Sequence, residues 1–451
     1  MRPGATAQPS ATTLAAGLAH AMLACPLWTF DVLVDGCGRA LGSRPGWLWP
    51  LVERVLSSYH RPPHDATREL ARFIAQTRAL HDAVEAARAD GRTIALQHLE
   101  TTPARSGENG ARGVPRIDGL NQLAEFFAVT PGQLDWLTDT AHYNGRTRRG
   151  RLHHYSYDWM RREGRAPRLL EVPSRRMREA QRLVLAEILT PLPLHDAAHG
   201  FVPSRSAITG AAAHVGAETL ITLDLSTFFA RVPARRVFGI LRRAAYPEAV
   251  AHALTGLCTH AVPSWVLARM PPGGSPEERA ALRESLTRSH LPQGSPTSPA
   301  LSNLSVRGLD GRLDGWAAAS GFSYTRYADD LCFSGPHLTH RAAASFIAGA
   351  ERIVAAEGHR VNRRKTRISG AGSRQSVTGI VVNERLNATR EHVDELKAIL
   401  HNCAVHGQAS QNRFGHPEFR AHLEGRITWV AALNPGRGAR LRRQFDLIDW
   451  G

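Results

Sequence analysis

Two adjacent carboxylates between two strand-forming runs constrain the fold of this chain more than any other feature. The acids are Asp329 and Asp330 in the tetrapeptide YADD (327–330), with FSY (322–324) before it and LCF (331–333) after it. This pattern predicts a tight β-hairpin with the acids at its tip. Because adjacent aspartates repel each other, a fold that presents both together generally has a divalent cation to neutralise them. The alternative for the pair alone is a solvated turn, in which Asp is common.

A third acid stands at the end of an apolar run. Asp224 follows LITL (220–223), whose Leu, Ile and Thr residues are typical of a strand. A strand that ends on an Asp presents the carboxylate at the edge of its sheet, where a site can use it. The alternative is an N-cap for the helix that follows. The functional interpretation therefore requires the sheet to bring Asp224 beside Asp329.

A loop of small residues offers a surface for a phosphate or a sugar. The segment LPQGSPTSP (291–299) is rich in Gly, Pro and Ser, and ALSNL (300–304) after it begins a helix. Small residues before a helix let the backbone approach a ligand closely. The strand-forming runs 220–224 and 324–333, separated by helical stretches, predict an α+β, palm-like sheet. No GxGxxG or GxxxxGK[ST] motif occurs, which argues against dinucleotide-binding and P-loop enzymes.

The net charge indicates a polyanionic partner. The chain has 451 residues, with 56 Lys and Arg against 40 Asp and Glu, a net charge of +16. Such a surface attracts nucleic acid; the alternative source of the charge is a high-GC genome, which favours Arg. Arginine is densest from 145 to 182, where Tyr155, Tyr157 and Trp159 are interleaved. Basic residues with stacking aromatics are typical of nucleic-acid binding.

The pattern elsewhere is mainly helical. Apolar residues recur at helical spacing from 65 to 90, and 14–27 predicts an Ala- and Leu-rich helix too short to span a membrane. The polar run 101–113 predicts a linker, and 120–139 predicts a helix, a turn and a second helix. We interpret that unit as plain helical packing and not as a complete DNA-binding motif. The five cysteines are scattered, which indicates neither a zinc site nor a disulfide framework and suits a reducing cytoplasm.

Taken in order, the acid strand, PQGSPTSP and YADD resemble the reverse transcriptase family. Four further segments resemble the same family: RLLEVPSRRMREAQR (168–182), HGFVPSRS (199–206), GHRVNRRKT (358–366) and VTGIVVN (377–383). The resemblance extends from about residue 120 to the C-terminus and is greatest to the bacterial retron type, whose VTG signature residues 377–379 match. A second retron signature, Asn-Ala-x-x-His, is matched in part by GAAAH (210–214), where Gly210 stands in place of the Asn.

The resemblance implies an α+β, right-hand polymerase architecture with fingers, a palm built on an antiparallel sheet and a helical thumb. It also implies fingers at 119–217, a palm at 218–386 with a finger-like helical insertion at about 234–290, and a thumb at 387–451. Ahead of these parts, the residue pattern predicts a helical N-terminal extension at 1–100 and a linker at 101–118.

The resemblance further implies nucleotidyl transfer with two Mg²⁺ ions, for which Mn²⁺ would substitute. The expected catalytic acids are Asp224, Asp329 and Asp330, and the metal ligands are these acids and the Leu225 carbonyl. The expected nucleotide-binding residues are Arg168, Phe229, Gln293, Gly294 and Lys365. The expected RNA- and primer-binding residues are His214, Tyr327, Val377, Thr378, Gly379, Arg426 and Arg437.

Two of these residues have alternatives. Phe229 is expected to lie under the sugar and exclude a 2′-hydroxyl, but it could instead pack in the core and exchange roles with Phe228. Lys365 could be a solvated surface charge instead of a triphosphate ligand.

A retron-type enzyme would bind a cognate noncoding RNA, prime from a guanosine 2′-hydroxyl and use dNTPs to make a small branched RNA–DNA molecule (msDNA). Its expected partners are that RNA, its DNA product and an effector protein from the same operon. The expected setting is antiphage defence in the cytoplasm, without a membrane. Three alternatives stay open: a free-standing reverse transcriptase of diversity-generating or abortive-infection type, a catalytically silent RNA-binding scaffold, and a DNA-binding regulator. The three acids argue against the scaffold, and the regulator leaves most of the chain unexplained.

Overall fold

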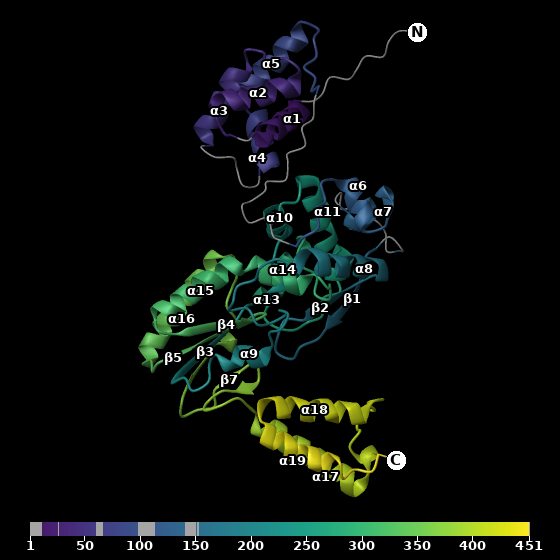
Figure 1. Ribbon diagram of the computed structural model, residues 1–451, viewed down its shortest axis with the longest axis vertical. Helices are drawn as coiled ribbons and strands as arrows, with labels where there is room; N and C mark the ends of the chain where they lie inside the picture. Colours follow the sequence, from purple (N-terminus) through teal and green to yellow (C-terminus); the bar gives the residue numbers. More distant parts are fainter. Residues whose placement is uncertain are drawn as a thin grey trace. The chain divides into compact units, whose positions relative to one another are not determined.

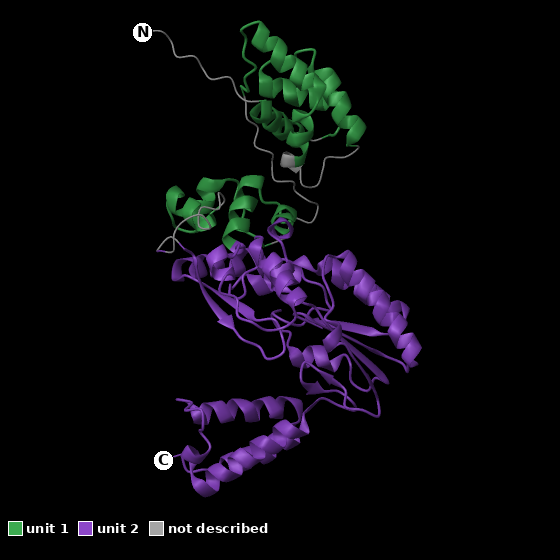
Figure 2. Ribbon diagram, turned by 180° about the vertical axis from the view of Figure 1, so that it is seen from behind, with its two compact units in different colours: residues 1–142, 238–257 green, residues 143–237, 258–451 purple. Residues whose placement is uncertain are grey.

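The computed structural model describes residues 11–25, 27–59, 66–97, 113–139, 150 and 153–450. The chain divides into two compact units (Figure 2): unit 1 contains residues 1–142 and 238–257, and unit 2 contains residues 143–237 and 258–451. The predicted linker 101–113 lies outside the described residues except for Gly113, as does most of the arginine cluster 145–151. Within the described ranges, no helix has both the length and the apolar character needed to cross a membrane.

Unit 1 is helical (Figure 1). Its helices are α1 (Ala11–Ala24), α2 (Phe30–Leu41), α3 (Leu48–Ser58), α4 (Ala66–Ala75), α5 (Arg78–Ala89), α6 (Leu120–Phe126) and α7 (Pro131–Thr138). The chain leaves unit 2 within α10 (Ala234–Arg243) and returns to it at the end of α11 (Glu248–Cys258). Helices α1 to α5 share one buried core that includes Leu18, Leu33 and Leu51.

Helices α4 to α7 cover two stretches for which the sequence predicts helices. The helical spacing from 65 to 90 is confirmed and is divided between the two helices α4 and α5. The break is at Thr77, which has extended dihedral angles (φ −75°, ψ 137°) and donates its hydroxyl to the Ile74 carbonyl oxygen at 2.6 Å. The helix, turn and helix expected at 120–139 are confirmed as α6 and α7, and the Thr130 hydroxyl accepts a hydrogen bond from the Gln133 N–H to cap α7.

Unit 2 is built on a four-stranded antiparallel sheet in the order β4-β5-β3-β6. Its strands are β3 (Thr219–Asp224), β4 (Ser323–Tyr327), β5 (Asp330–Gly335) and β6 (Arg367–Gly370). Side chains alternate between the two faces of a strand. Ile221 and Leu223 face the core formed with α15 (Arg307–Ala319) and α16 (His340–Ala356), whereas Leu220 and Cys332 belong to a different core on the opposite face.

The same alternation determines where the acids point. Asp224 shares its face of β3 with Leu220, and Asp330 shares its face of β5 with Cys332. The two carboxylates therefore lie on the face of the sheet that α15 and α16 leave uncovered.

Unit 2 contains two smaller antiparallel sheets, one of β1 (Tyr155–Met160) and β2 (Arg168–Pro173), the other of β7 (Ser376–Val377), β8 (Ile380–Val381) and β9 (Asn387–Ala388). Its remaining elements are α8 (Arg175–Leu183), the π-helix η1 (Val184–Leu189), α9 (Ala207–Ala212), the 3₁₀ turn η2 (Phe229–Arg231), α12 (Ser264–Leu267), α13 (Pro276–Thr287), α14 (Ser298–Ser305), and the 3₁₀ turns η3 (Arg363–Lys365) and η4 (Gln408–Ser410).

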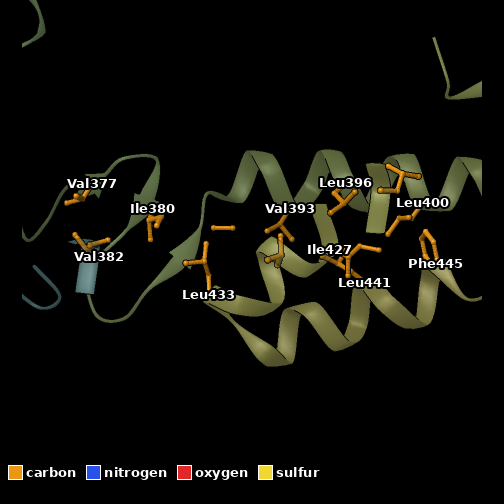
Figure 3. Close-up of a cluster of buried hydrophobic side chains, with 14 of the residues drawn as sticks. Val377, Ile380, Val382, Val393, Leu396, Leu400, Ile427, Leu433, Leu441 and Phe445 are labelled. Atoms are coloured by element: carbon orange, nitrogen blue, oxygen red, sulfur yellow. The ribbon is translucent and has the colours of Figure 1, made fainter. Parts of the chain in front are cut away.

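The chain ends in three helices, α17 (Arg390–His406), α18 (Phe419–Leu433) and α19 (Pro435–Phe445). They share a buried core with the β7–β8 hairpin, to which Val377, Ile380 and Val382 contribute (Figure 3). Leu396 and Ile427 are among the helical residues in this core. The hairpin is therefore attached to the three helices by apolar packing as well as by the chain itself.

Candidate active site

The three predicted acids lie together at one end of the sheet. Asp224 and Asp330 are directly opposite each other in the antiparallel pair β3–β5. The Leu225 N–H donates to the Asp329 carbonyl oxygen at 2.9 Å, which joins the end of β3 to the hairpin turn. Tyr327 pairs with Asp330, so Ala328 and Asp329 form the turn between β4 and β5. The predicted hairpin is confirmed, with Asp330 as the first residue of its second strand.

The turn depends on an unusual backbone and on a close neighbour. Ala328 has a φ of 54°, which residues other than Gly, Asn and Asp rarely adopt. A Cβ at Gly200 would lie 2.7 Å from the Ala328 nitrogen, so only glycine fits there without a shift of the turn.

A buried arginine supports the turn from beneath. Arg326 is fully buried and makes a double hydrogen bond with Asp310, from Nε to Oδ1 at 2.8 Å and from Nη2 to Oδ2 at 2.7 Å. Its Nη1 donates to Asn303 Oδ1 at 2.8 Å and to the Ala328 carbonyl oxygen at 3.1 Å. The site predicted from the sequence did not include this network. Arg326, directly before YADD, was the one sequence feature that could have indicated it.

Burial and neighbouring charges raise the pKa of the Asp329 and Asp330 carboxylates. The pKa of Asp330 rises from 3.8 to about 6, first because partial burial disfavours its charged form and then because the charges of Asp329 and Asp224 lie nearby. Burial and the Asp224 charge also raise the pKa of Asp329, while the positive charges of Lys365 and Arg168 act against that rise. The site therefore carries negative charge that the neighbouring cations compensate only in part.

The closest cation is Lys365 in η3, whose Nζ lies 2.5 Å from Asp224 Oδ2. Its side chain is 35% exposed, so the alternative of a fully solvated surface charge is wrong. Among the described residues, no three His, Cys, Asp or Glu side chains are arranged as a metal cluster. The donor set nevertheless fits hard divalent cations: acidic oxygens converge, burial and the neighbouring carboxylates raise the pKa values of Asp329 and Asp330, and a lysine ammonium neutralises Asp224.

A cavity of about 490 Å³ brings two of these acids, Asp224 and Asp330, together with other predicted residues. Asp224, Asp330, Tyr327 and Lys365 line it together with the β7–β8 turn, residues 377–379. In that turn Thr378 has a φ of 48° and Gly379 a φ of 83°, the backbone of a tight two-residue hairpin. Val377 is 4% exposed and packs in the apolar core, so the turn residues Thr378 and Gly379 are the accessible part.

A second cavity of about 380 Å³ contains Phe229, Gln293 and Gly294, together with Arg178 and Arg182 of α8. Phe228 is 4% exposed and packs in the core against α15 and α16, whereas its neighbour Phe229 is half-buried. Of the two phenylalanines, Phe229 is therefore the one that reaches a cavity, and its contact with a sugar stays a prediction.

Arginines of the β1–β2 hairpin lie near the acids. Arg168 begins β2 and is exposed, and Arg165 lines the larger cavity. Burial and the charges of Arg168 and Arg165 lower the pKa of Arg162, while Asp224 and Asp329 act to raise it. The sequence reading singled out Arg168 and missed Arg162 and Arg165, although all three lie in the arginine-rich segment.

The predicted RNA contact of His214 needs correction. The ring is 1% exposed, with Nδ1 2.7 Å from Ser334 Oγ and Nε2 2.6 Å from Thr325 Oγ1. Burial lowers its pKa to about 4, so the ring is neutral. His214 therefore braces β4 and β5 from inside the fold and has no free atom for a nucleic acid. Gly210 stands in place of the signature Asn. A Cβ added at this position would lie 3.2 Å from the Cβ of His199.

The aromatic residues of β1 make contacts within the fold. Tyr155 is buried, the Tyr157 hydroxyl lies 2.6 Å from His260 Nε2, and the Trp159 indole N–H donates to the Val266 carbonyl oxygen at 3.2 Å. The three rings lie on the same face of the strand and line a cavity of about 340 Å³, so their stacking on nucleic acid stays a prediction.

The two predicted arginines of the C-terminal helices make contacts within the protein. Arg426 Nη2 lies 3.1 Å from Glu395 Oε2, and Arg437 Nη1 donates to Asn387 Oδ1 at 3.1 Å. Neither lines the two cavities described above.

Comparison with known proteins agrees with this geometry. The family described as reverse transcriptase (RNA-dependent DNA polymerase) matches residues 161–397. The Retron Mx65 reverse transcriptase of Myxococcus xanthus is 40% identical over 67% of this chain and 67% of its own length. The Retron Mx162 reverse transcriptase of the same organism is 34% identical over 77% and 70%, and the Retron Ec86 reverse transcriptase of Escherichia coli is 30% identical over 75% and 91%. The chain thus belongs to the reverse transcriptase family and is an RNA-directed DNA polymerase of the retron type.

Proposed function

We propose that this polymerase copies part of a cognate structured noncoding RNA into msDNA, a small branched RNA–DNA molecule, using dNTPs. One observation carries the proposal: Asp224 and Asp330 line the same cavity as the Thr378–Gly379 turn, which belongs to the retron signature. A polymerase site that includes this turn is suited to a primer held by the turn and extended at the acids. The relatives named as retron reverse transcriptases support the same class of template.

We assign the parts of a right-hand polymerase to the boundaries expected from the sequence. Residues 119–217 form the fingers, 218–386 the palm with its helical insertion at about 234–290, and 387–451 the thumb. The antiparallel order β4-β5-β3-β6 supports the palm, and the three helices α17 to α19 support the thumb. Residues 1–100 are an N-terminal extension, and 101–118 are the linker.

Asp224, Asp329 and the Leu225 carbonyl would hold two divalent cations, Mg²⁺ with Mn²⁺ as a substitute, and Asp330 would assist. When bound, such cations make a hydroxyl a stronger nucleophile and stabilise charge on the transferred phosphoryl group. The raised pKa values of Asp329 and Asp330 support this assignment, because burial and the neighbouring carboxylates both disfavour the ionised forms without further positive charge.

The other residues bind and orient the substrates. Arg168 and Lys365 neutralise the triphosphate, and the Lys365 ammonium supplies a proton to the leaving pyrophosphate. Gln293 and the Gly294 backbone contact the nucleotide, and the Phe229 ring lies under its sugar and excludes a 2′-hydroxyl.

The nucleic acid is held by a separate set of residues. Tyr327 and the Thr378–Gly379 turn hold the primer end. Arg426 and Arg437 contact phosphates, after exchange of their present partners Glu395 and Asn387. The msDNA would act with an effector protein of the same operon in antiphage defence, in the cytoplasm.

Co-purification tests the proposal. The chain is expressed with its native upstream DNA, and nucleic acid extracted from the purified protein is treated with DNase and RNase. A small DNase-sensitive species that carries RNA is expected with the wild type and not with Asp329→Asn/Asp330→Asn. Extension of a homopolymer template without such a species would leave the polymerase and remove the msDNA assignment. Bound RNA with neither activity would favour the scaffold.

A further inference from the structure

A buried ion pair joins the two segments that carry the proposed nucleotide-binding residues. Glu171 lies in the middle of β2, and His290 precedes the loop that contains Gln293 and Gly294. Both side chains are 1% exposed, and His290 Nε2 lies 3.1 Å from Glu171 Oε2. Burying two ionisable groups costs free energy unless they are paired and hydrogen-bonded. None of the roles assigned above explains why both are here.

The hydrogen bonds of His290 fix its charge state. Nδ1 lies 2.7 Å from the Arg288 carbonyl oxygen, and Nε2 faces the Glu171 carboxylate. A carbonyl oxygen and an ionised carboxylate only accept hydrogen bonds, so beside an ionised Glu171 both ring nitrogens carry a hydrogen and the ring is an imidazolium. Burial opposes this charge, but the Glu171 carboxylate and the two hydrogen bonds outweigh it and raise the pKa of His290.

The side chains of His260 and Tyr157, which lie beside Glu171 and His290, are uncharged. The backbones of His260 and His290 exchange two hydrogen bonds of 2.9 Å, and the His260 ring bonds to the Tyr157 hydroxyl. Burial and the nearby histidines hold the pKa of His260 well below its usual value, so this ring is neutral. Tyr157 stands opposite Glu171 in the β1–β2 register, and burial raises the pKa of its hydroxyl. The imidazolium of His290 is thus the counter-ion that Glu171 contacts directly.

Glu171 also holds the Gln293 loop, through two hydrogen bonds and a close approach of the Gly294 backbone. Its N–H donates to the Gln293 carbonyl oxygen at 2.8 Å, and its Oε2 accepts from the Gln293 N–H at 3.3 Å. A Cβ at Gly294 would lie 2.6 Å from the Glu171 carbonyl oxygen, and Gly294 has a φ of 131°. The loop backbone is therefore pressed against β2 at Glu171. Arg168 is three residues earlier on the same strand.

We propose that Glu171 and His290 are positioning residues that set the spacing between Arg168 and the Gln293–Gly294 loop for an incoming deoxynucleoside triphosphate. This inference rests on the proposed nucleotide-binding roles of Arg168, Gln293 and Gly294. Neither Glu171 nor His290 touches Asp224, Asp329 or Asp330. Loss of the pair should therefore weaken nucleotide binding and leave the chemical step nearly intact.

Steady-state kinetics on a primed template tests the inference. Glu171→Gln and His290→Gln should each raise the KM for dNTP about tenfold or more, because small displacements of substrate-positioning groups have large effects, with kcat changed less than about threefold. The double variant should recover part of the loss, because two amides can hydrogen-bond without leaving a buried charge. Glu179→Gln, the same change in an exposed ion pair with Arg175, is the matched control and should leave KM unchanged.

The outcomes separate this inference from the function on which it rests. If Arg168→Ala and Gln293→Ala leave the KM for dNTP unchanged, the proposed nucleotide site itself fails. If those variants raise KM but folded Glu171→Gln does not, only the positioning role fails. Should both pair variants misfold, the wild type still decides through ¹⁵N NMR of its histidines. A His290 ring that is still an imidazolium above pH 7 supports the pair, and a ring that titrates near 6.5 overturns it.

Discussion

The Arg326 guanidinium donates to the Ala328 carbonyl oxygen at 3.1 Å while Asp310 holds its other side, so a buried ion pair fixes the left-handed residue next to Asp329 and Asp330. Removing one partner of such a pair costs about 3–5 kcal/mol, because the remaining charge is buried alone. We expect Asp310→Asn to destabilise the fold by that order and to lower kcat, measured by thermal denaturation and single-turnover extension.

A matched control for this pair is Tyr324→Phe. It removes only the hydroxyl that donates to Asp310 at 2.9 Å, so it should cost roughly 1 kcal/mol and leave kcat nearly unchanged. Equal loss of kcat in both variants would show that the ion pair has no specific role at the turn.

The stability of the fold should depend on Asp330. Its pKa is raised from 3.8 to about 6, so the folded state binds its proton more tightly than the unfolded state does. The ionised side chain therefore destabilises the fold as pH rises from about 4 to 6. Asp330→Asn should raise the melting temperature at pH 7.5 in EDTA, by an amount that disappears below pH 4. The gain is on the order of 1 kcal/mol, given the exposure of the group. A wild type that is as stable as Asp330→Asn at every pH would contradict this.

Divalent cations should stabilise the wild type selectively. Because they would compensate the acids, added Mg²⁺ should raise the melting temperature of the wild type relative to EDTA. Asp224→Asn/Asp329→Asn should lose this response. Differential scanning fluorimetry measures both, and an equal rise in the double variant would place the cation elsewhere.

Substitution of the two adjacent phenylalanines should affect two different properties, sugar selectivity for Phe229 and fold stability for Phe228. Phe229→Ala should increase ribonucleotide incorporation relative to deoxyribonucleotide, because the side chain lines a cavity at the Gln293 loop. Phe228→Ala should instead destabilise the fold by about 3–5 kcal/mol, because Phe228 is buried in the core. Competition assays with matched dNTP and rNTP, and chemical denaturation, check the two effects. Selectivity lost in Phe228→Ala alone would reverse the assignment.

Local sequence patterns predicted the elements that present the site. The strand ending at Asp224, the hairpin around Asp329 and the loop that enters α14 each follow from a few consecutive residues. What the sequence left open depends on partners far along the chain. The His214 ring bonds to residues 111 and 120 positions away, and Glu171 pairs with a histidine 119 positions away. No periodicity encodes such pairs, and the break at Thr77 interrupts an apolar spacing that continues on both sides of it.

The β7–β8 hairpin and helices α17 to α19 share one apolar core, and this has a mechanical consequence. Close-packed cores transmit displacement and do not absorb it. If the C-terminal helices tilt to admit or release a growing duplex, the Thr378–Gly379 turn travels with them as part of the same rigid body. The turn would then hold the primer end, and the helices would make room for the duplex, in a single movement. A more rigid core should therefore slow translocation along the template as much as it fixes the position of the primer.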